Sequence, residues 1–301
     1  MISKNAIAVF LMAAVAVTPS YAFVPCNSRG VATWGSHVCH MSAVATYEAA
    51  MEKMSAKDKT STSLSKEDLK VIYDDEHIVI IDKPAGVLCV PGKENNPSLA
   101  SAVFEAFGCE SGNVDKMVAQ RLGFDTSGLV AFAKTNAALS KLNQLLRAQK
   151  VSRKYEALVT GTVGEESGSI EFPLQRNPEN LPFMKVSDED SMRALLGIAD
   201  DLPKELKKKF IKNPMKCLTT YEVVGKEELD GQDVTRVSLI SVSGRTHQLN
   251  VHCAAFGHPI VGDSIYGNGD ADGAPKVHLK ELSFEHPITR EKLSFSSDSP
   301  F

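Results

Sequence analysis

The residues best suited to chemistry lie in the segment 120–129, Gln-Arg-Leu-Gly-Phe-Asp-Thr-Ser-Gly-Leu. Arg121 supplies a permanent positive charge on a planar guanidinium that suits carboxylates and phosphates. Asp125 is the acid of the segment, and a carboxylate can stabilise or trap positive charge that develops on a substrate. Thr126 and Ser127 follow, and their hydroxyls can form local hydrogen bonds that hold a loop. The pattern indicates an active-site loop with one basic and one acidic side chain.

Other motifs with charged, aromatic and amide side chains recur along the chain. Tyr155 lies in one of them, where a half-buried packing role is the alternative to a chemical one. Its phenol is a weak base at neutral pH, so a role in proton transfer depends on geometry. The motifs are residues 81–86 (Ile-Asp-Lys-Pro-Ala-Gly), 153–159 (Arg-Lys-Tyr-Glu-Ala-Leu-Val), 244–252 (Gly-Arg-Thr-His-Gln-Leu-Asn-Val-His), 257–263 (Gly-His-Pro-Ile-Val-Gly-Asp) and 282–287 (Leu-Ser-Phe-Glu-His-Pro).

In this order the motifs resemble those of the RluA-like pseudouridine synthases, whose first motif usually reads His-Arg-Leu-Asp-x-x-Thr-Ser-Gly. The sequence departs from that pattern at Gln120, at Asn250, where arginine is usual, and at Gly123, which takes the place of the catalytic aspartate. The resemblance implies the pseudouridine synthase fold. This is an α+β fold with a mixed, largely antiparallel sheet flanked by helices, in a single catalytic-type domain.

The resemblance also implies a reaction, the isomerisation of uridine to pseudouridine in tRNA or rRNA. The C1′–N1 bond breaks and the uracil rejoins through C5, with the uridine flipped out of its stack and with neither a metal nor a cofactor. By resemblance, Arg245 pairs with the family's aspartate, and Tyr155 stacks on the uracil and assists proton removal from C5. Contacts to substrate RNA are implied for Lys83, Arg121, Thr126, Ser127, His247 and Gln248.

Gly123 leaves the activity open. Asp125 could replace the missing acid, but along an extended chain its Cα lies roughly 6.5–7 Å from that of residue 123. Misplacing a reacting group by about 1 Å can cost on the order of 100-fold in rate. Arg245 could then bind Asp125, a substrate phosphate or nothing.

Three hypotheses follow. The chain is an RNA pseudouridine synthase of reduced activity, a catalytically silent RNA-binding or assembly factor on the same fold, or an interaction protein that has lost RNA binding too. Retention of Arg121, Tyr155 and Arg245 makes the third the least favoured.

The elements that position these residues follow from the apolar spacing. The domain should begin near Leu69, with a hairpin formed by 71–75 and 78–82. The apolar run 129–133 predicts a central strand, which puts the motif 120–128 on the loop that enters it. Two segments have helical spacing, 99–107 and 137–149.

Residues 187–216 are an insertion relative to the family pattern. Acidic residues come first, and a cluster of lysines follows. A solvated amphipathic helix and an RNA-contacting arm both fit this composition. The lysines are Lys204, Lys207, Lys208, Lys209, Lys212 and Lys216.

The first residues differ from the rest in character. Residues 1–22 have the apolar run and small-residue ending of a signal peptide, and the run is too short to span a bilayer. Residues 23–68 begin with phenylalanine and are polar, as in a transit-like segment followed by a linker. Together they resemble the plastid presequences of diatoms, with ordinary secretion as the alternative. The domain then covers 69–301, and the mature form is expected to have no membrane segment.

Charge and cysteine content set limits on partners. The formal net charge is −4 at pH 7, so the chain cannot bind a phosphate backbone by overall charge and needs a local basic groove. The six cysteines have neither paired nor zinc-ligand spacing, which indicates free thiols and no metal site.

Overall fold

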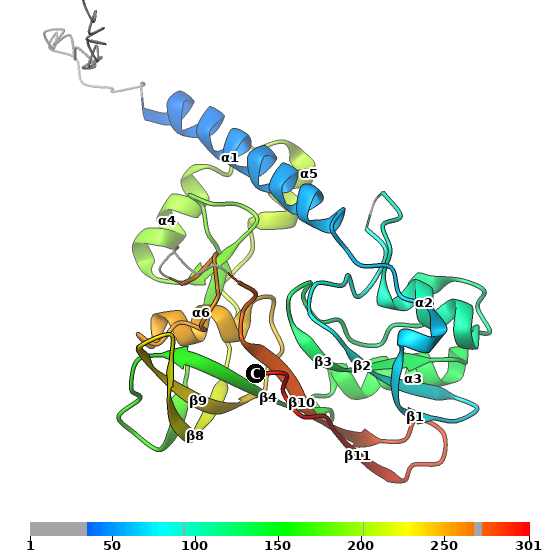
Figure 1. The fold of residues 1–301 in the computed structure, drawn as a ribbon. Coiled ribbons are helices and arrows are strands. Elements are labelled where there is room, and N and C mark those ends of the chain that lie inside the picture. Colours follow the sequence, from blue (N-terminus) through cyan, green and yellow to red (C-terminus); the bar gives the residue numbers. More distant parts are fainter. Residues whose placement is uncertain (1–34, 93, 201, 268–272) are drawn as a thin grey trace, which may run out of the picture.

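The computed structural model describes residues 35–92, 94–200, 202–267 and 273–301, with side chains from residue 43 onward (Figure 1). The predicted signal peptide 1–22 and the first part of the transit-like segment lie outside the described residues. The described chain forms one α+β domain built on a nine-stranded sheet.

The sheet is mixed and largely antiparallel, as predicted. Only the pair β3–β10 is parallel among the described strands, and this pair joins the two halves of the sheet. In spatial order the strands are β1 (Lys70–Asp74), β2 (Ile78–Lys83), β3 (Ser127–Ala133), β10 (Val277–Glu285), β4 (Ser152–Thr160), β9 (Gln232–Ser241), β8 (Thr219–Leu229) and β5 (Ser167–Ile170), with β11 (Lys292–Ser296) paired to β10. A separate hairpin consists of β6 (Leu174–Arg176) and β7 (Met184–Val186).

One half of the sheet carries the predicted hairpin and central strand. The turn between β1 and β2 is held by Asp75, whose carboxylate accepts the N–H groups of His77 and Ile78. Strand β3 is buried along its whole length, which explains its continuous apolar sequence. Helix α2 (Leu99–Phe107) begins at the N-cap Ser98 and α3 (Asn136–Arg147) at the N-cap Thr135. Two short 3-10 turns, η1 (Lys66–Asp68) and η2 (Val114–Lys116), complete this half.

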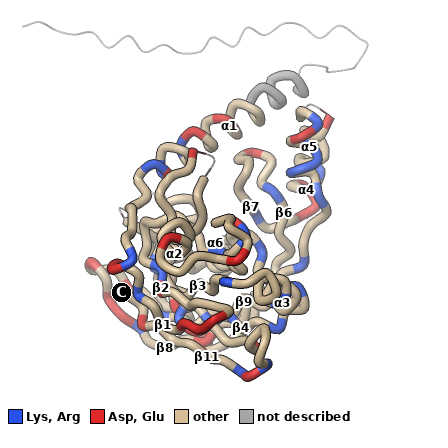
Figure 2. The backbone as a smooth tube through the Cα atoms, turned by 90° about the vertical axis from the view of Figure 1, so that its right-hand side faces the viewer, with Lys and Arg blue, Asp and Glu red and all other residues tan. Residues whose placement is uncertain are grey.

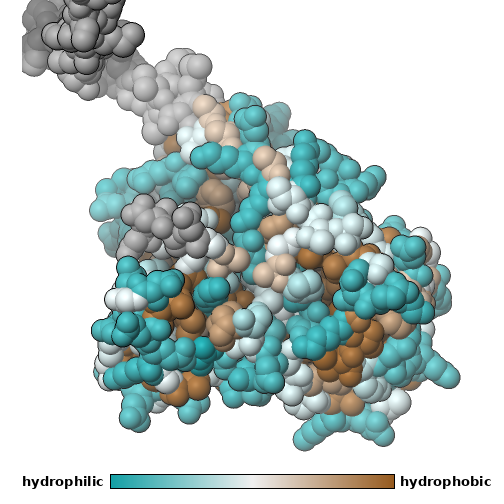
Figure 3. Space-filling view, viewed as in Figure 1, coloured by the Kyte–Doolittle hydropathy of each residue, from teal (hydrophilic) through white to brown (hydrophobic). Residues whose placement is uncertain are grey.

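A second core lies under α6 (Gln248–Ala255) and strands β4, β8 and β9. Tyr155 packs against both cores, so it marks the place where the two halves of the sheet meet. Figure 3 shows brown, apolar surface in two places on this face, with hydrophilic and intermediate residues between them.

Gly128 allows the two halves to approach each other. Its φ is +117°, and a Cβ there would collide with the backbone of Leu279 on β10. Only glycine combines this conformation with this closeness. The parallel junction of β3 and β10 therefore fixes where the motif loop 120–126 leaves the sheet.

Residues 35–58 form a long helix, α1 (Gly35–Asp58), where the sequence predicted a transit-like segment and a polar linker. Its Ala43, Val44 and Tyr47 pack against the insertion, whose two helices are α4 (Glu189–Gly197) and α5 (Lys204–Phe210). The apolar spacing of these residues is helical, but the polar stretch that follows hides it. The packed structure therefore begins well before Leu69.

The insertion packs against α1 on one side and is exposed to solvent on the other. Leu195, Ile198 and Phe210 are buried in the cluster shared with α1, and the Tyr47 and Phe210 ring centroids are 5.3 Å apart. The α5 lysines stay exposed, and Figure 2 shows blue segments at α5, which lies beside α4. Among the described residues no helix has the length and apolar character needed to cross a bilayer.

Tyr47→Ala is expected to lower the free energy of unfolding by about 2 kcal/mol, because it removes a half-buried ring from the α1 cluster. The matched control is Glu48→Ala on the exposed face, expected to change it by less than about 0.5 kcal/mol. Urea denaturation measures both. Equal stability of the two variants would contradict the packing of α1.

Candidate active site

Three of the predicted motifs, 120–129, 153–159 and 244–252, contribute residues to one cleft of about 390 Å³. The motif loop contributes Arg121, Leu122, Gly123 and Thr126, β4 contributes Arg153 and Tyr155, and the segment 244–250 closes the other side. Three arginines line the cleft. None of its lining residues, all within the described part of the chain, is an aspartate or glutamate.

The motif loop is a turn, not the extended segment on which the Asp125 hypothesis depended. The Thr126 N–H donates to the Gly123 carbonyl at 3.2 Å, and the Phe124 carbonyl accepts the Gly86 N–H at 3.0 Å. A turn sends consecutive side chains in different directions. Gly123 and Thr126 consequently line the cleft, and Asp125 does not.

Asp125 forms an ion pair with Lys57 of α1. The same ammonium lies 5.4 Å from the centroid of the Phe124 ring. With its carboxylate held on α1 and outside the cleft lining, Asp125 is not placed to act on a substrate there. The geometry contradicts the displaced-acid role predicted for it.

Lys83 is fully buried, so the RNA contact predicted for it is also wrong. Its ammonium donates to the carbonyl oxygens of Pro84, Phe124 and Thr126 at 2.8–2.9 Å. Burial lowers the pKa of Lys83 to about 8. The Lys83 side chain thus holds the motif loop through its backbone carbonyls and does not line the cleft.

Gly123 does not use the special freedom of glycine. Its φ lies outside the left-handed region that favours glycine. A Cβ built there would lie 3.3 Å from Thr126 Oγ1, a close contact that a small movement of the hydroxyl relieves. The loop can therefore carry a side chain at the position where the family carries its aspartate.

Tyr155 lines the cleft from β4, between Leu239 of β9 and Leu279 of β10. Burial raises the pKa of its phenol, and Arg153 opposes that effect. The phenol is therefore neutral at physiological pH. Its ring can stack on a planar base in the cleft.

Arg153 is a site residue that the predictions left out. In a strand, residues two apart share a face, so Arg153 lies on the same face as Tyr155, and this alternation was the signal for it. Its Nη2 donates to the Ser241 carbonyl at 3.3 Å. Its buried Nε has no hydrogen-bond partner among the described residues.

Arg121 and Arg245 are exposed at the cleft. Within the described ranges, neither guanidinium forms an ion pair or a hydrogen bond with the protein. Of the partners considered for Arg245, Asp125 is excluded because it pairs with Lys57, and both cations remain available to a ligand.

Gln248 and Ser127 shape the site from inside. Gln248 is buried, donates to Leu218 O and Thr219 Oγ1 at 2.9 Å and accepts the Arg245 N–H at 2.9 Å. Gln248 lines the cleft, but its side-chain amide already forms hydrogen bonds within the protein. Ser127 is buried with its hydroxyl 2.9 Å from His278 Nδ1, so the RNA contact predicted for Ser127 is not available.

His247 faces the cleft from a left-handed backbone position, with φ of 52°. Its Nδ1 lies 2.7 Å from the hydroxyl of Tyr266, and its ring is stacked on Phe183. Burial is the main cause that lowers the pKa of His247, and the positive charge of nearby Arg176 lowers it further. The imidazole is therefore neutral at physiological pH. His247 therefore presents a neutral aromatic ring to a ligand in the cleft.

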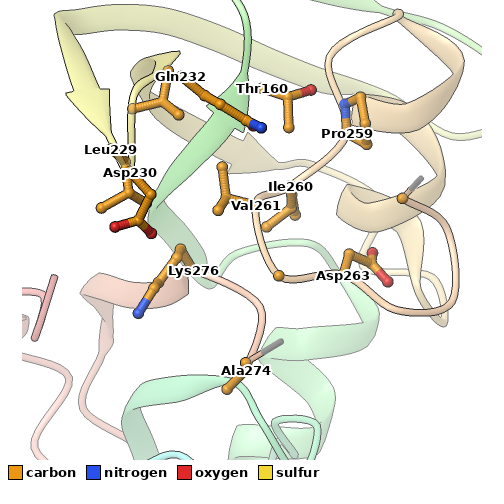
Figure 4. A pocket seen from close by; sticks show the side chains of 14 residues that line it. Thr160, Leu229, Asp230, Gln232, Pro259, Ile260, Val261, Asp263, Ala274 and Lys276 are labelled. Carbon is orange, nitrogen blue, oxygen red and sulfur yellow. The ribbon is translucent and has the colours of Figure 1, made fainter. Parts of the chain in front are cut away.

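A larger cavity, of about 630 Å³, lies between the β8–β9 turn and the segment 259–263 (Figure 4). None of the predicted site residues lines it, and its charged side chains are Asp230, Asp263 and Lys276. Size alone does not make it the site, since Arg121, Tyr155 and Arg245 line the other cleft and only the motif 257–263 reaches this cavity. No group of acids, histidines and cysteines within the described residues could hold a metal ion.

Comparisons with known proteins agree with this fold. Residues 77–255 match the RNA pseudouridylate synthase family. The chain is 35% identical over 239 residues to the dual-specificity RNA pseudouridine synthase RluA of Pasteurella multocida, an alignment that covers 77% of this chain and 94% of that protein. The RluA protein of Haemophilus influenzae is 33% identical over the same shares.

Among solved structures, human RNA pseudouridylate synthase domain containing 1 superposes with a TM-score of 0.62 at 24% identity, covering 80% of this chain and 87% of the human chain. That likeness supports the fold. The sequence matches establish the family: the chain belongs to the RluA-type RNA pseudouridine synthases.

Proposed function

We propose that this family member binds a uridine of tRNA or rRNA in the cleft and isomerises it at a strongly reduced rate, or only binds it as an assembly factor. The observation that carries the proposal is a cleft lined by three arginines and by no acid among the described residues. Cations without an internal counter-ion favour an anionic ligand, and RNA offers phosphates.

The reaction chemistry explains why the protein can keep RNA binding and yet lose most of its catalytic rate. Positive charge develops at C1′ as the glycosidic bond breaks, and a preorganised carboxylate is the group that stabilises it. Gly123 supplies none, and the Asp125 carboxylate is paired with Lys57. Tyr155 and the arginines can still hold the flipped base and its phosphate.

The test uses the full chain. Organellar tRNA and rRNA are incubated with it, binding is measured by retention, and pseudouridine is quantified in single turnover beside the Pasteurella multocida RluA protein. The proposal expects RNA binding with product formation at least about 100-fold slower than that enzyme's. Turnover at a similar rate would refute reduced activity, and absence of binding would refute the proposal as a whole.

Arg245→Gln is expected to weaken RNA binding about 10-fold, because it removes an exposed guanidinium from the cleft and with it a charge-assisted contact to phosphate. Arg147→Gln, at the end of α3 and outside the cleft lining, is the matched control and should bind as the unchanged protein does. Fluorescence anisotropy at several salt concentrations measures both. Equal affinities would argue against phosphate binding by Arg245.

We also propose a plastid destination, which rests on the composition of residues 1–46. A fluorescent protein fused behind these residues in a diatom cell should accumulate in the plastid. Secretion of the reporter would favour the alternative.

A further inference from the structure

A third cavity, of about 470 Å³, lies between α1 and the tip of the β6–β7 hairpin, and we name it the α1 groove. Helix α1 lines it with Lys53, Met54 and Lys57, and the hairpin tip lines it with Phe183. This volume is within the range of small-ligand sites. Since α1 lies outside the residues 77–255 that match the family, the groove is a feature of this chain's own N-terminal segment.

The groove presents positive charge and no negative charge among the described residues that line it. Its α1 residues follow helical spacing and form one face of the helix, and Glu48 and Glu52 are absent from that face. Lys57 is paired with Asp125, whereas the ammonium of Lys53 is exposed and has no partner within the described ranges. Lys53 is therefore the cation that a ligand phosphate can use.

Residues of the groove contact the walls of the active-site cleft at two places. At one place Phe183 lies against His247, with ring centroids 6.2 Å apart and planes 29° apart, and His247 lines the cleft. At the other place Lys57 contacts Asp125 and the Phe124 ring in the loop whose Gly123 lines the cleft. These contacts place the groove next to the active-site cleft.

We propose that the α1 groove is a subsite for the nucleotide next to the target uridine in single-stranded RNA. Phe183 stacks on the base of that nucleotide, and Lys53 binds its phosphate. Aromatic platforms beside cations are how proteins hold unpaired nucleotides without reading their sequence. The inference rests on the proposed function, since it assigns the path of RNA beyond the cleft.

The test compares a ligand confined to the cleft with one that reaches the groove. The probes are uridine monophosphate and a short single-stranded RNA with one uridine flanked by purines. Phe183→Ala in the full chain is expected to weaken binding of the RNA about 10-fold and to leave binding of uridine monophosphate unchanged. Phe183→Tyr, which keeps a stacking ring, should restore the affinity for RNA.

Lys53→Gln should lower the slope of log affinity against log salt by about 0.7, the contribution of one phosphate contact in a single strand. The matched controls are Phe256→Ala, an exposed aromatic residue at the end of α6, and Lys226→Gln on β8. Neither residue lines the groove or the cleft, and both variants should bind as the unchanged protein does.

Three results would overturn the subsite. The first is unchanged RNA affinity in both Phe183→Ala and Lys53→Gln. The second is an equal loss of both ligands in Phe183→Ala, which would mean that Phe183 acts only by positioning His247. The third is concentration-dependent dimerisation that Phe183→Ala abolishes, since the groove would then hold a second copy. If the unchanged protein binds no RNA, the proposed function itself fails, and this outcome is distinct from the other three.

Discussion

Gly123→Asp is expected to raise the rate of pseudouridine formation by about 100-fold or more, because it returns a carboxylate to a cleft that has kept its cations. Gly123 and Arg245 line the same cleft, so the new carboxylate regains the guanidinium that the family resemblance assigns to it. A paired and preorganised acid would then face the sugar where positive charge develops.

The loop can accept this substitution. The φ of Gly123 is one that other residues adopt, and the nearest atom to a new Cβ is the flexible hydroxyl of Thr126, at 3.3 Å. A nearby backbone atom would have been a greater obstacle, as at Gly128. The cost to stability should therefore be small, about 1 kcal/mol or less.

The matched control is Gly123→Asn, which has the same shape and no charge. Single-turnover assays on organellar RNA should show a gain for aspartate and none for asparagine. Asp125→Asn should not change the residual rate, because Asp125 faces Lys57. A gain with Gly123→Asn would trace the effect to loop shape, and a loss with Asp125→Asn would revive the displaced acid.

Most of the fold follows from the sequence because its signals are local. The buried run 129–133 becomes β3, and the segments 99–107 and 137–149 become α2 and α3, the latter ending slightly early. The turn that Asp75 holds is likewise encoded within a few residues. Helix α1 was missed because its stability comes from the insertion, a contact between segments far apart in the sequence.

The sequence motifs predict which segments form the site, but they do not predict where each side chain of these segments points. Tyr155, Arg121 and Arg245 meet in one cleft, as the resemblance implied. A sequence cannot tell that the loop turns at Phe124, and one turn sends Asp125 to α1. The same limit applies to Lys83, for which the resemblance implied an RNA contact although its partners are backbone carbonyls.

Lys83→Met is expected to lower the free energy of unfolding by about 3 kcal/mol, because it keeps the volume of the side chain but leaves three buried carbonyl oxygens without their donor. Two of these carbonyls belong to Phe124 and Thr126, so the motif loop should loosen as well. Urea denaturation measures the first effect. Hydrogen exchange of the Gly86 and Thr126 amides, which donate to the loop carbonyls of Phe124 and Gly123, measures the second.

The pH dependence identifies the ammonium as the cause. The pKa of Lys83 is about 8 in the folded chain against an ordinary value of 10.5, so between these values the unfolded chain binds a proton that the folded chain has released. The stability of the unchanged protein should consequently rise with pH across this window, by up to about 1.4 kcal/mol per pH unit for this one group. In Lys83→Met this contribution is lost, and the gap in stability between the two proteins should widen from pH 8 to pH 10. A constant gap across that range would mean that Lys83 keeps its proton in the folded chain and that its three acceptors outweigh the cost of burying the charge.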